Sequence, residues 1–107
     1  MVRDHDYKVQ YAPAVHDHLR AIPKRHHGLL KEAIEAQLFA EPGVESTNRK
    51  RLAPSTEVDA EWELRTGPKN AFRVFYSIDQ QRMIVRVVAI GVKIRNRLKI
   101  GRDEVNL

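Results

Sequence analysis

The feature that most constrains the fold is the segment 83–90, Met-Ile-Val-Arg-Val-Val-Ala-Ile, in which Arg86 is the only polar residue. A nearly continuous apolar run of this length is typical of a strand covered on both faces, because a half-exposed strand alternates apolar and polar residues. Gly91 follows the run and predicts its end. We therefore expect a central strand at 83–90 with packed layers on either side.

Two segments before the central strand alternate between apolar and polar residues, as half-buried strands do. Residues 61–65 place Trp62 and Leu64 on one face and three charged residues on the other. Residues 72–78 alternate in the same way, and the segment 66–70 between them contains the glycine and proline of a turn. The two strands should form a hairpin, and a second turn leads into the central strand. The sheet should therefore be mainly antiparallel.

The N-terminal part of the chain predicts a strand and two helices. The first strand is expected at 7–11, with its inward side chains being Tyr7, Val9 and Tyr11. One helix follows from Pro13 to Pro23 and a second from Pro23 to Ala40, because apolar residues recur every three or four positions in each. The stripe that the second helix should bury is Leu30, Ile34 and Leu38. Two helices joined at a proline form an αα-hairpin, which needs a sheet to cover.

The remaining segments complete the expected order β-α-α-β-β-β-α. Residues 44–59 have no period and predict a surface connection. Ile94 and Leu98 are four residues apart before Gly101, which predicts a short C-terminal helix at 93–100. We therefore expect one α+β domain over 1–107, with a mainly antiparallel sheet and the αα-hairpin packed on one face. Its core should include Val9, Leu19, Leu30, Ile34, Trp62, Val74 and Val88.

Composition excludes several kinds of chemistry. The chain has no cysteine, so disulfides, thiolate nucleophiles and thiolate metal sites are ruled out. His16 and His18 stand two apart and His26 and His27 are adjacent, not four apart as a helical metal pair requires, so we expect neither metal nor cofactor. No apolar run reaches the roughly 18 residues that cross a bilayer, and residues 1–10 are charged where a signal peptide is apolar. We expect a cytoplasmic protein without membrane contact.

The charge is positive and unevenly distributed. Nineteen Lys and Arg residues against fourteen Asp and Glu give a net charge of +5, which favours a nucleic acid or an acidic protein as partner. The stretch between Arg82 and Arg102 contains no acidic residue, so the C-terminal end is the basic end. A second basic run, Arg49-Lys50-Arg51, is either a loop that contacts phosphate or a solvated charge cluster, and we favour the phosphate-contacting loop. The candidate RNA-binding residues are Arg49, Lys50, Arg51, Arg95, Arg97 and Lys99.

Three short motifs in this order, Trp62-Glu63-Leu64-Arg65, Phe72-Arg73-Val74-Phe75-Tyr76 and Val87-Val88-Ala89-Ile90-Gly91-Val92-Lys93, resemble the RelE/ParE toxin superfamily. The resemblance covers nearly the whole chain and is stronger to RelE than to ParE. It implies the toxin of a type II toxin-antitoxin pair, with a cognate antitoxin, the ribosome and messenger RNA as partners and a toxin-antitoxin hetero-oligomer as an assembly. RelE-type members cut messenger RNA in the ribosomal decoding site without a metal, and ParE-type members inhibit DNA gyrase.

By position, the resemblance assigns Arg73 and Lys93 to the catalytic centre, and alternation adds Arg65 on the same sheet face. Guanidinium groups stay charged and form paired hydrogen bonds to phosphate, which suits stabilisation of the charge that develops during RNA cleavage. The alternative for Arg73 is a structural ion pair with Glu63, which lies opposite it in one allowed hairpin register.

Two departures from the family pattern leave the general base unassigned. Glu61 and Glu63 stand where well-known RelE members carry lysines, and Lys99 stands near the place of a tyrosine. Both glutamates are expected to be solvated on an exposed strand face, and Tyr76 is expected to pack in the core. The sequence thus favours a ribosome-dependent endoribonuclease that inhibits translation. A ParE-like gyrase inhibitor and a nucleic-acid binder without activity remain as alternatives.

Overall fold

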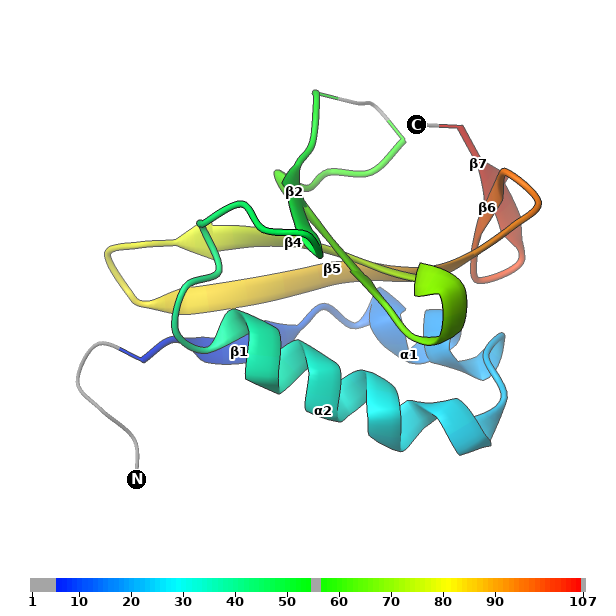
Figure 1. Ribbon diagram of the computed structural model, residues 1–107, viewed down its shortest axis with the longest axis horizontal. Helices are drawn as coiled ribbons and strands as arrows, with labels where there is room; N and C mark the ends of the chain where they lie inside the picture. The colour runs from blue at the N-terminus through cyan, green and yellow to red at the C-terminus, as the bar shows by residue number, and fades with distance from the viewer. Residues whose placement is uncertain (1–5, 55–56, 107) are drawn as a thin grey trace.

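The computed structural model describes residues 6–54 and 57–106, which form an α+β fold with two α-helices and a mostly antiparallel sheet (Figure 1). The sheet has the strand order β2-β3-β4-β5-β6-β7, and β1 adds a parallel strand beside β5. The elements in chain order are β1 Lys8–Tyr11, α1 Ala14–Arg20, the 3-10 turn η1 Lys24–His26, α2 His27–Leu38, β2 Arg49–Arg51, β3 Trp62–Thr66, the 3-10 turn η2 Pro68–Asn70, β4 Phe72–Asp79, β5 Ile84–Ile94, β6 Arg97–Ile100 and β7 Asp103–Val105.

Helices α1 and α2 cover one face of the sheet, as Figure 1 shows, so the two expected helices are present on one side of it. The stripe Leu30, Ile34 and Leu38 is fully buried against β3, β4 and β5. Among the other core predictions, Trp62 and Val74 are buried, and Val9, Leu19 and Val88 are only half-buried. Neither helix is long and apolar enough to span a membrane, within the residues described.

Tyr11 was expected to face inward but is 39% exposed. Tyr11 is the last residue of β1, and helix α1 begins three residues after it. Tyr11 there lines a cavity between α1 and α2 together with Val15 and Leu30. The alternation of 7–11 identified the strand correctly but could not show that its end lies beside an opening.

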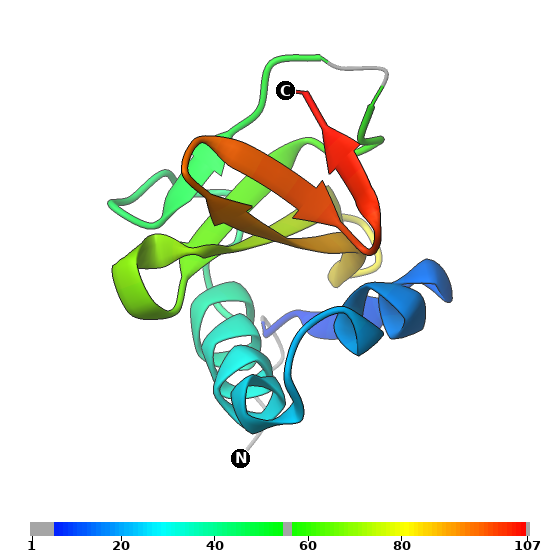
Figure 2. The ribbon, with the colours of Figure 1, turned by 90° about the vertical axis from the view of Figure 1, so that its right-hand side faces the viewer.

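The opposite face of the sheet carries a second, smaller apolar cluster. Phe75 and Ala89 lie at its centre, and Leu98 and Ile100 cover them from β6. Val58, in the segment between β2 and β3, closes the cluster from another side. Figure 2 shows β6 and β7 turned across the sheet on this side, away from the helices. Strand β5 is thus covered on both faces, as its apolar sequence predicts.

The expected end of the central strand at Gly91 is wrong, because β5 continues to Ile94. Gly91 lies where β6 crosses close to β5. A Cβ atom added at Gly91 would lie 2.7 Å from the backbone oxygen of Lys99 and 3.0 Å from Cγ1 of Ile100. Glycine in a strand often marks such a close approach of another backbone. Here it permits strand pairing and does not end the strand.

The predicted C-terminal helix at 93–100 is also wrong. Arg95 and Asn96 have φ values of 52° and 65°, and they form a tight turn that joins β5 to β6. Two consecutive residues with positive φ fit a two-residue hairpin turn, in which asparagine is favoured. The apolar residues Leu98 and Ile100 then alternate with Arg97 and Lys99 at the period of a strand. The spacing of four residues between Ile94 and Leu98 suggested a helix. In the structure Ile94 is the last residue of β5 and Leu98 lies in β6, so the two do not share one element.

The segment 44–59 was expected to be a surface connection, and part of it is a strand. Strand β2 pairs with β3 through the register Arg49 with Leu64 and Arg51 with Trp62. Ser46 accepts hydrogen bonds from the backbone N–H groups of Asn48 and Arg49 at 3.2 and 3.1 Å, which turns the chain into the strand. Strand β2 consists of three charged residues, which do not alternate between apolar and polar, so the local sequence did not predict a strand here.

Candidate nucleic-acid interface

Three predicted site residues lie in a row on the sheet face opposite the helices. Arg65 of β3 lies directly opposite Arg73 of β4, and Arg73 lies opposite Gly91 of β5. Lys93 is two residues beyond Gly91 and therefore points to the same face, where it lies opposite Leu98 of the second apolar cluster. Diagonal neighbours in an antiparallel sheet are within reach of long side chains. We call Arg65, Arg73 and Lys93 the cation row.

A buried carboxylate holds the two arginines of the row. Oε1 of Glu63 accepts a hydrogen bond from Nε of Arg65 at 2.7 Å, and Oε2 lies 3.6 Å from Nη1 of Arg73. Glu63 is only 5% exposed and is the buried charged residue of the described chain. Its expected solvation is therefore wrong. Burial of a carboxylate is costly unless it is paired and hydrogen-bonded, and two guanidinium groups meet that requirement.

The ion pair between Glu63 and Arg73 exists, but not in the register considered from the sequence. Glu63 lies opposite Phe75, so it reaches Arg73 diagonally. The hairpin turn decides this offset. Residues Lys69 and Asn70 both have φ of 55°, and the oxygen of Asn70 accepts a hydrogen bond from Nε of Arg73 at 3.0 Å. Arg73 is thus fixed both by the turn before it and by the neighbouring strand.

Hydrogen bonds at either end of the row fix the strands that carry it. Asn48 accepts from the backbone N–H of Arg65 at 2.8 Å and donates through Nδ2 to the backbone oxygen of Arg65 at 2.9 Å. The backbone N–H of Lys93 donates to the oxygen of Ala71 at 2.7 Å. The row therefore lies on paired strands whose spacing is set by the backbone, as a preorganised site requires.

The row differs in exposure along its length. The side chain of Arg65 is 40% exposed and that of Arg73 is 11% exposed. Each guanidinium has five N–H donors, and the contacts to Glu63 and Asn70 use only some of them. The remaining donors of Arg65 can reach an incoming phosphate, and Arg73 lies deeper, where a carboxylate restricts its orientation. The row can therefore bind an anion in a defined geometry.

The basic run of β2 divides between the two faces of the sheet. Lys50 lies opposite Glu63, is exposed and shares the face of the cation row. Arg49 points to the helix side, where Nη1 donates to the backbone oxygen and to Oε1 of Gln37 at 3.1 and 2.8 Å. Arg51 lies 5.7 Å from the centre of the Trp62 ring. Strand pairing thus brings only Lys50 of the three to the cation row.

The cations after Lys93 do not join the row. Arg97 lies opposite Ile94 and Lys99 lies opposite Val92, so both point to the face that carries the helices. Arg95 is in the turn between β5 and β6. Arg95, Arg97 and Lys99 were expected to bind RNA, but strand β6 places Arg97 and Lys99 away from the row. In a strand, alternation sends neighbouring side chains to opposite faces.

Other ionisable residues near the sheet are held in structural roles. Tyr76 is fully buried and its hydroxyl donates to the oxygen of Pro42 at 2.7 Å, and burial raises the pKa of this phenol above its ordinary value. Tyr76 therefore packs in the core, as the sequence predicts. Glu61 is exposed, and one of its carboxylate oxygens lies 3.4 Å from the backbone N–H of Ile78. Neither is placed to act beside the cation row.

No protein-family model, no curated protein and no solved structure matches the chain. Its function must therefore be inferred from the arrangement of its own residues.

Proposed function

We propose that this chain is a RelE-like toxin that cuts messenger RNA at the ribosome without a metal and is held inactive by a cognate antitoxin. The observation that carries the proposal is the cation row, in which Arg65 and Arg73 are oriented by a buried carboxylate and Lys93 lies beside them. Apart from the added strand β2, the order of a strand, two helices and three antiparallel strands is the expected one as far as β5. The C-terminal hairpin departs from it.

In this proposal the cation row binds the scissile phosphate. RNA cleavage by the 2′-oxygen builds up negative charge on the phosphate oxygens, and fixed guanidinium groups stabilise that charge best when they need no rearrangement. Arg73 supplies this stabilisation, Lys93 adds a second positive charge, and Arg65 with Lys50 guides the RNA backbone along the sheet. Glu63 acts as a positioning residue, because it touches the arginines and not the RNA.

The same contacts favour one alternative, a toxin that binds its target without cutting RNA. Glu63 is engaged with both arginines, so it is poorly suited to remove a proton from the 2′-hydroxyl. Without another general base, the row would bind nucleic acid or, in a ParE-like protein, inhibit DNA gyrase. A toxin that cuts RNA and a toxin that only binds its target are therefore distinguished by whether cleaved RNA appears.

The test is to express the chain briefly in a bacterial host and to map RNA 5′ ends. We expect new ends within translated codons for the wild-type chain. Arg73→Ala should lower the rate of cleavage about a hundredfold, the scale seen when one preorganised donor is removed. Circular dichroism and urea unfolding of the variant establish that it remains folded.

The matched control is Arg82→Ala, which removes an arginine whose side chain is 78% exposed in the turn between β4 and β5. Cleavage by this variant should stay within about twofold of wild type, as for surface changes away from a site. A folded Arg73→Ala chain that cuts RNA at the wild-type rate would contradict the catalytic assignment. Growth arrest without new 5′ ends would favour the binding alternative.

A further inference from the structure

A cavity of about 260 Å³ lies between α1, α2 and the end of β1, on the helix side of the sheet. We call it the helix cavity. No residue of the cation row lines it, so its chemistry is independent of the proposed RNA site. Its volume exceeds the roughly 150 Å³ of an apolar cavity that binds benzene. The helix cavity is therefore large enough to hold a single ring.

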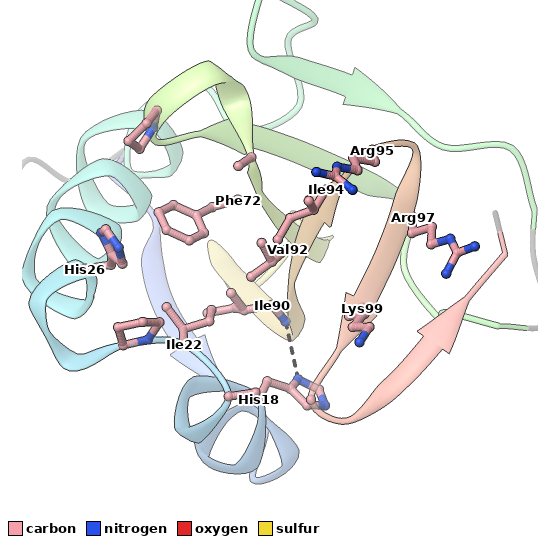
Figure 3. A pocket seen from close by; sticks show the side chains of 15 residues that line it. His18, Ile22, His26, Phe72, Ile90, Val92, Ile94, Arg95, Arg97 and Lys99 are labelled. Carbon is pink, nitrogen blue, oxygen red and sulfur yellow. Dashed lines mark hydrogen bonds between the residues drawn. The ribbon is translucent and has the colours of Figure 1, made fainter.

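The floor of the helix cavity is apolar. Its aliphatic lining residues are Val15, Leu19, Leu30, Ile34 and Ile90. All of these except Leu19 are at most 2% exposed. Ile90 is the one residue that it shares with a larger, separate groove between α1 and the hairpin of β5 and β6, which Figure 3 shows. An apolar interior of this kind favours an apolar group over water.

Two histidines hold the walls of the helix cavity in place. Nε2 of His27 donates to the backbone oxygens of Leu19 and Ile22 at 2.9 and 2.8 Å, which ties the end of α1 to the start of α2. On the other side of α1, Nδ1 of His18 accepts a hydrogen bond from the backbone N–H of Ile90 at 3.3 Å, the dashed line in Figure 3. Helix α1 is thus anchored to both α2 and β5. The helix cavity is preformed, as ligand sites usually are.

Three polar side chains stand at the mouth of the helix cavity. Tyr11 of β1, His16 of α1 and Lys31 of α2 line it and are exposed. Within residues 6–54 and 57–106, none of the three side chains has a hydrogen-bond or ion-pair partner. An apolar cavity with a few converging polar groups, which fix the orientation of the ligand, is the usual form of a small-molecule site.

The chemistry of the mouth favours a ligand that accepts hydrogen bonds and carries negative charge. The Lys31 ammonium group can only donate, and its bond to a carboxylate is stronger than one between neutral groups. Burial raises the pKa of the Tyr11 phenol, and the charge of Glu35 raises it further, so Tyr11 stays a hydroxyl donor at neutral pH. No Asp or Glu lines the helix cavity. The nearby charge of Glu35 opposes an anion and limits its affinity.

We propose that the helix cavity is a binding site for a small organic acid, one apolar ring that carries a carboxylate. The ring packs among Leu19, Ile34 and Ile90, and the carboxylate accepts from Lys31 and Tyr11. The ligand contacts neither Arg73 nor any other residue of the cation row. The inference therefore does not depend on RNA cleavage.

The test uses the full chain, and its probe is phenylacetate. A titration followed by ¹H–¹⁵N NMR compares this acid with phenylacetamide, which has the same shape without the charge, and with phenethylamine, which carries a positive charge. We expect a dissociation constant for phenylacetate of about 1 mM or below, which is within reach of a ligand of about ten non-hydrogen atoms. Phenylacetamide should bind about fivefold more weakly, and phenethylamine more weakly still.

One variant tests the carboxylate contact. Lys31→Met keeps the apolar stem and removes the ammonium group, so this variant should bind phenylacetate and phenylacetamide equally well. The matched control is Lys24→Met, which changes an exposed lysine of η1 that does not line the helix cavity. This control should keep the roughly fivefold preference for the acid.

A second variant tests the apolar floor. Leu19→Phe places a larger side chain in the helix cavity and should weaken binding of both ligands at least about tenfold. Its control is Leu29→Phe, at a residue of α2 that is 62% exposed and lies outside the helix cavity, and it should change affinity less than about twofold. Urea unfolding establishes which variants fold. If Leu19→Phe does not fold, the comparison of the two lysine variants decides.

Three outcomes would overturn the inference. The first is equal binding of phenylacetate and phenylacetamide to the wild-type chain, or no binding of either at about 10 mM. The second is an equal loss of acid preference in Lys31→Met and Lys24→Met. The third is a set of NMR shifts at Arg65 and Arg73 in place of shifts at Leu30 and Ile34. The acid would then be bound by the cation row as an adventitious ion only.

Discussion

The two faces of the sheet bury apolar area and carry positive charge in different ways. On the helix side, α1 and α2 cover a large core, and Arg97 and Lys99 of β6 point to this side and are exposed. On the opposite side, a smaller core is closed by β6 and the segment before β3, and two arginines there are held by the buried Glu63. The same residue type therefore serves two purposes. A fixed guanidinium offers defined geometry, and an exposed one offers screened attraction.

The largest effect on stability is expected on the helix side, at Ile34. Ile34 lies on the buried side of α2, is 1% exposed and belongs to the larger core. Ile34→Ala should lower the free energy of unfolding by about 4 kcal/mol, since buried isoleucine truncation costs both transfer and cavity free energy. Urea unfolding measures the change. A loss below about 0.5 kcal/mol would contradict the packing of α2 on the sheet.

The opposite side should show a somewhat smaller effect at Glu63. Glu63→Gln removes the charge that pairs with Arg65 and Arg73 and should lower the free energy of unfolding by about 3 kcal/mol, the lower end for breaking a buried pair. The lower end applies because Arg65 remains 40% exposed to water. Glu61→Gln, at the exposed residue directly before β3, is the control and should change the free energy of unfolding by less than about 0.5 kcal/mol. Equal effects of the two substitutions would show that Glu63 does not hold the arginines.

The smallest effect is expected at His18 of α1, which lies beside Ile90 of β5. Burial lowers the pKa of His18 below its ordinary value of 6.5, against the opposing charge of Asp17. Nδ1 of His18 also accepts a hydrogen bond from the backbone N–H of Ile90 at 3.3 Å, which requires the neutral ring. The unfolded chain therefore binds the proton more readily, and stability should fall as pH drops below about 6.5.

His18→Gln should remove this part of the pH dependence. The difference in unfolding free energy between wild type and variant should shrink by on the order of 0.5 kcal/mol from pH 7.5 to pH 5.5, the low end of the net contribution of a hydrogen bond. Urea unfolding at the two pH values measures it. A difference that stays constant or grows toward acid pH would show that His18 is not buried in its neutral form.

The sequence by itself determined the elements whose pattern is local. The period of 29–38 gave a helix with Leu30, Ile34 and Leu38 on its buried stripe, and the alternation of 61–65 and 72–78 gave a hairpin with Trp62 and Val74 inward. These patterns are reliable because each side chain's direction follows from the geometry of its own helix or strand. The placement of Arg65 and Arg73 on one face followed from the same alternation, whereas Lys93 lies on that face because β5 continues past Gly91.

Only the tertiary structure decided which strands pair and what surrounds each charge. Gly91 was expected to end the strand, but it is a glycine because β6 crosses close to it. Arg97 and Lys99 lie on the helix side because 97–100 is a strand. Glu63 is buried because β2, β4 and the second apolar cluster enclose it, although its neighbours in sequence resemble those of any exposed strand. Burial and pairing depend on residues distant in the chain, and local periodicity carries no information about them.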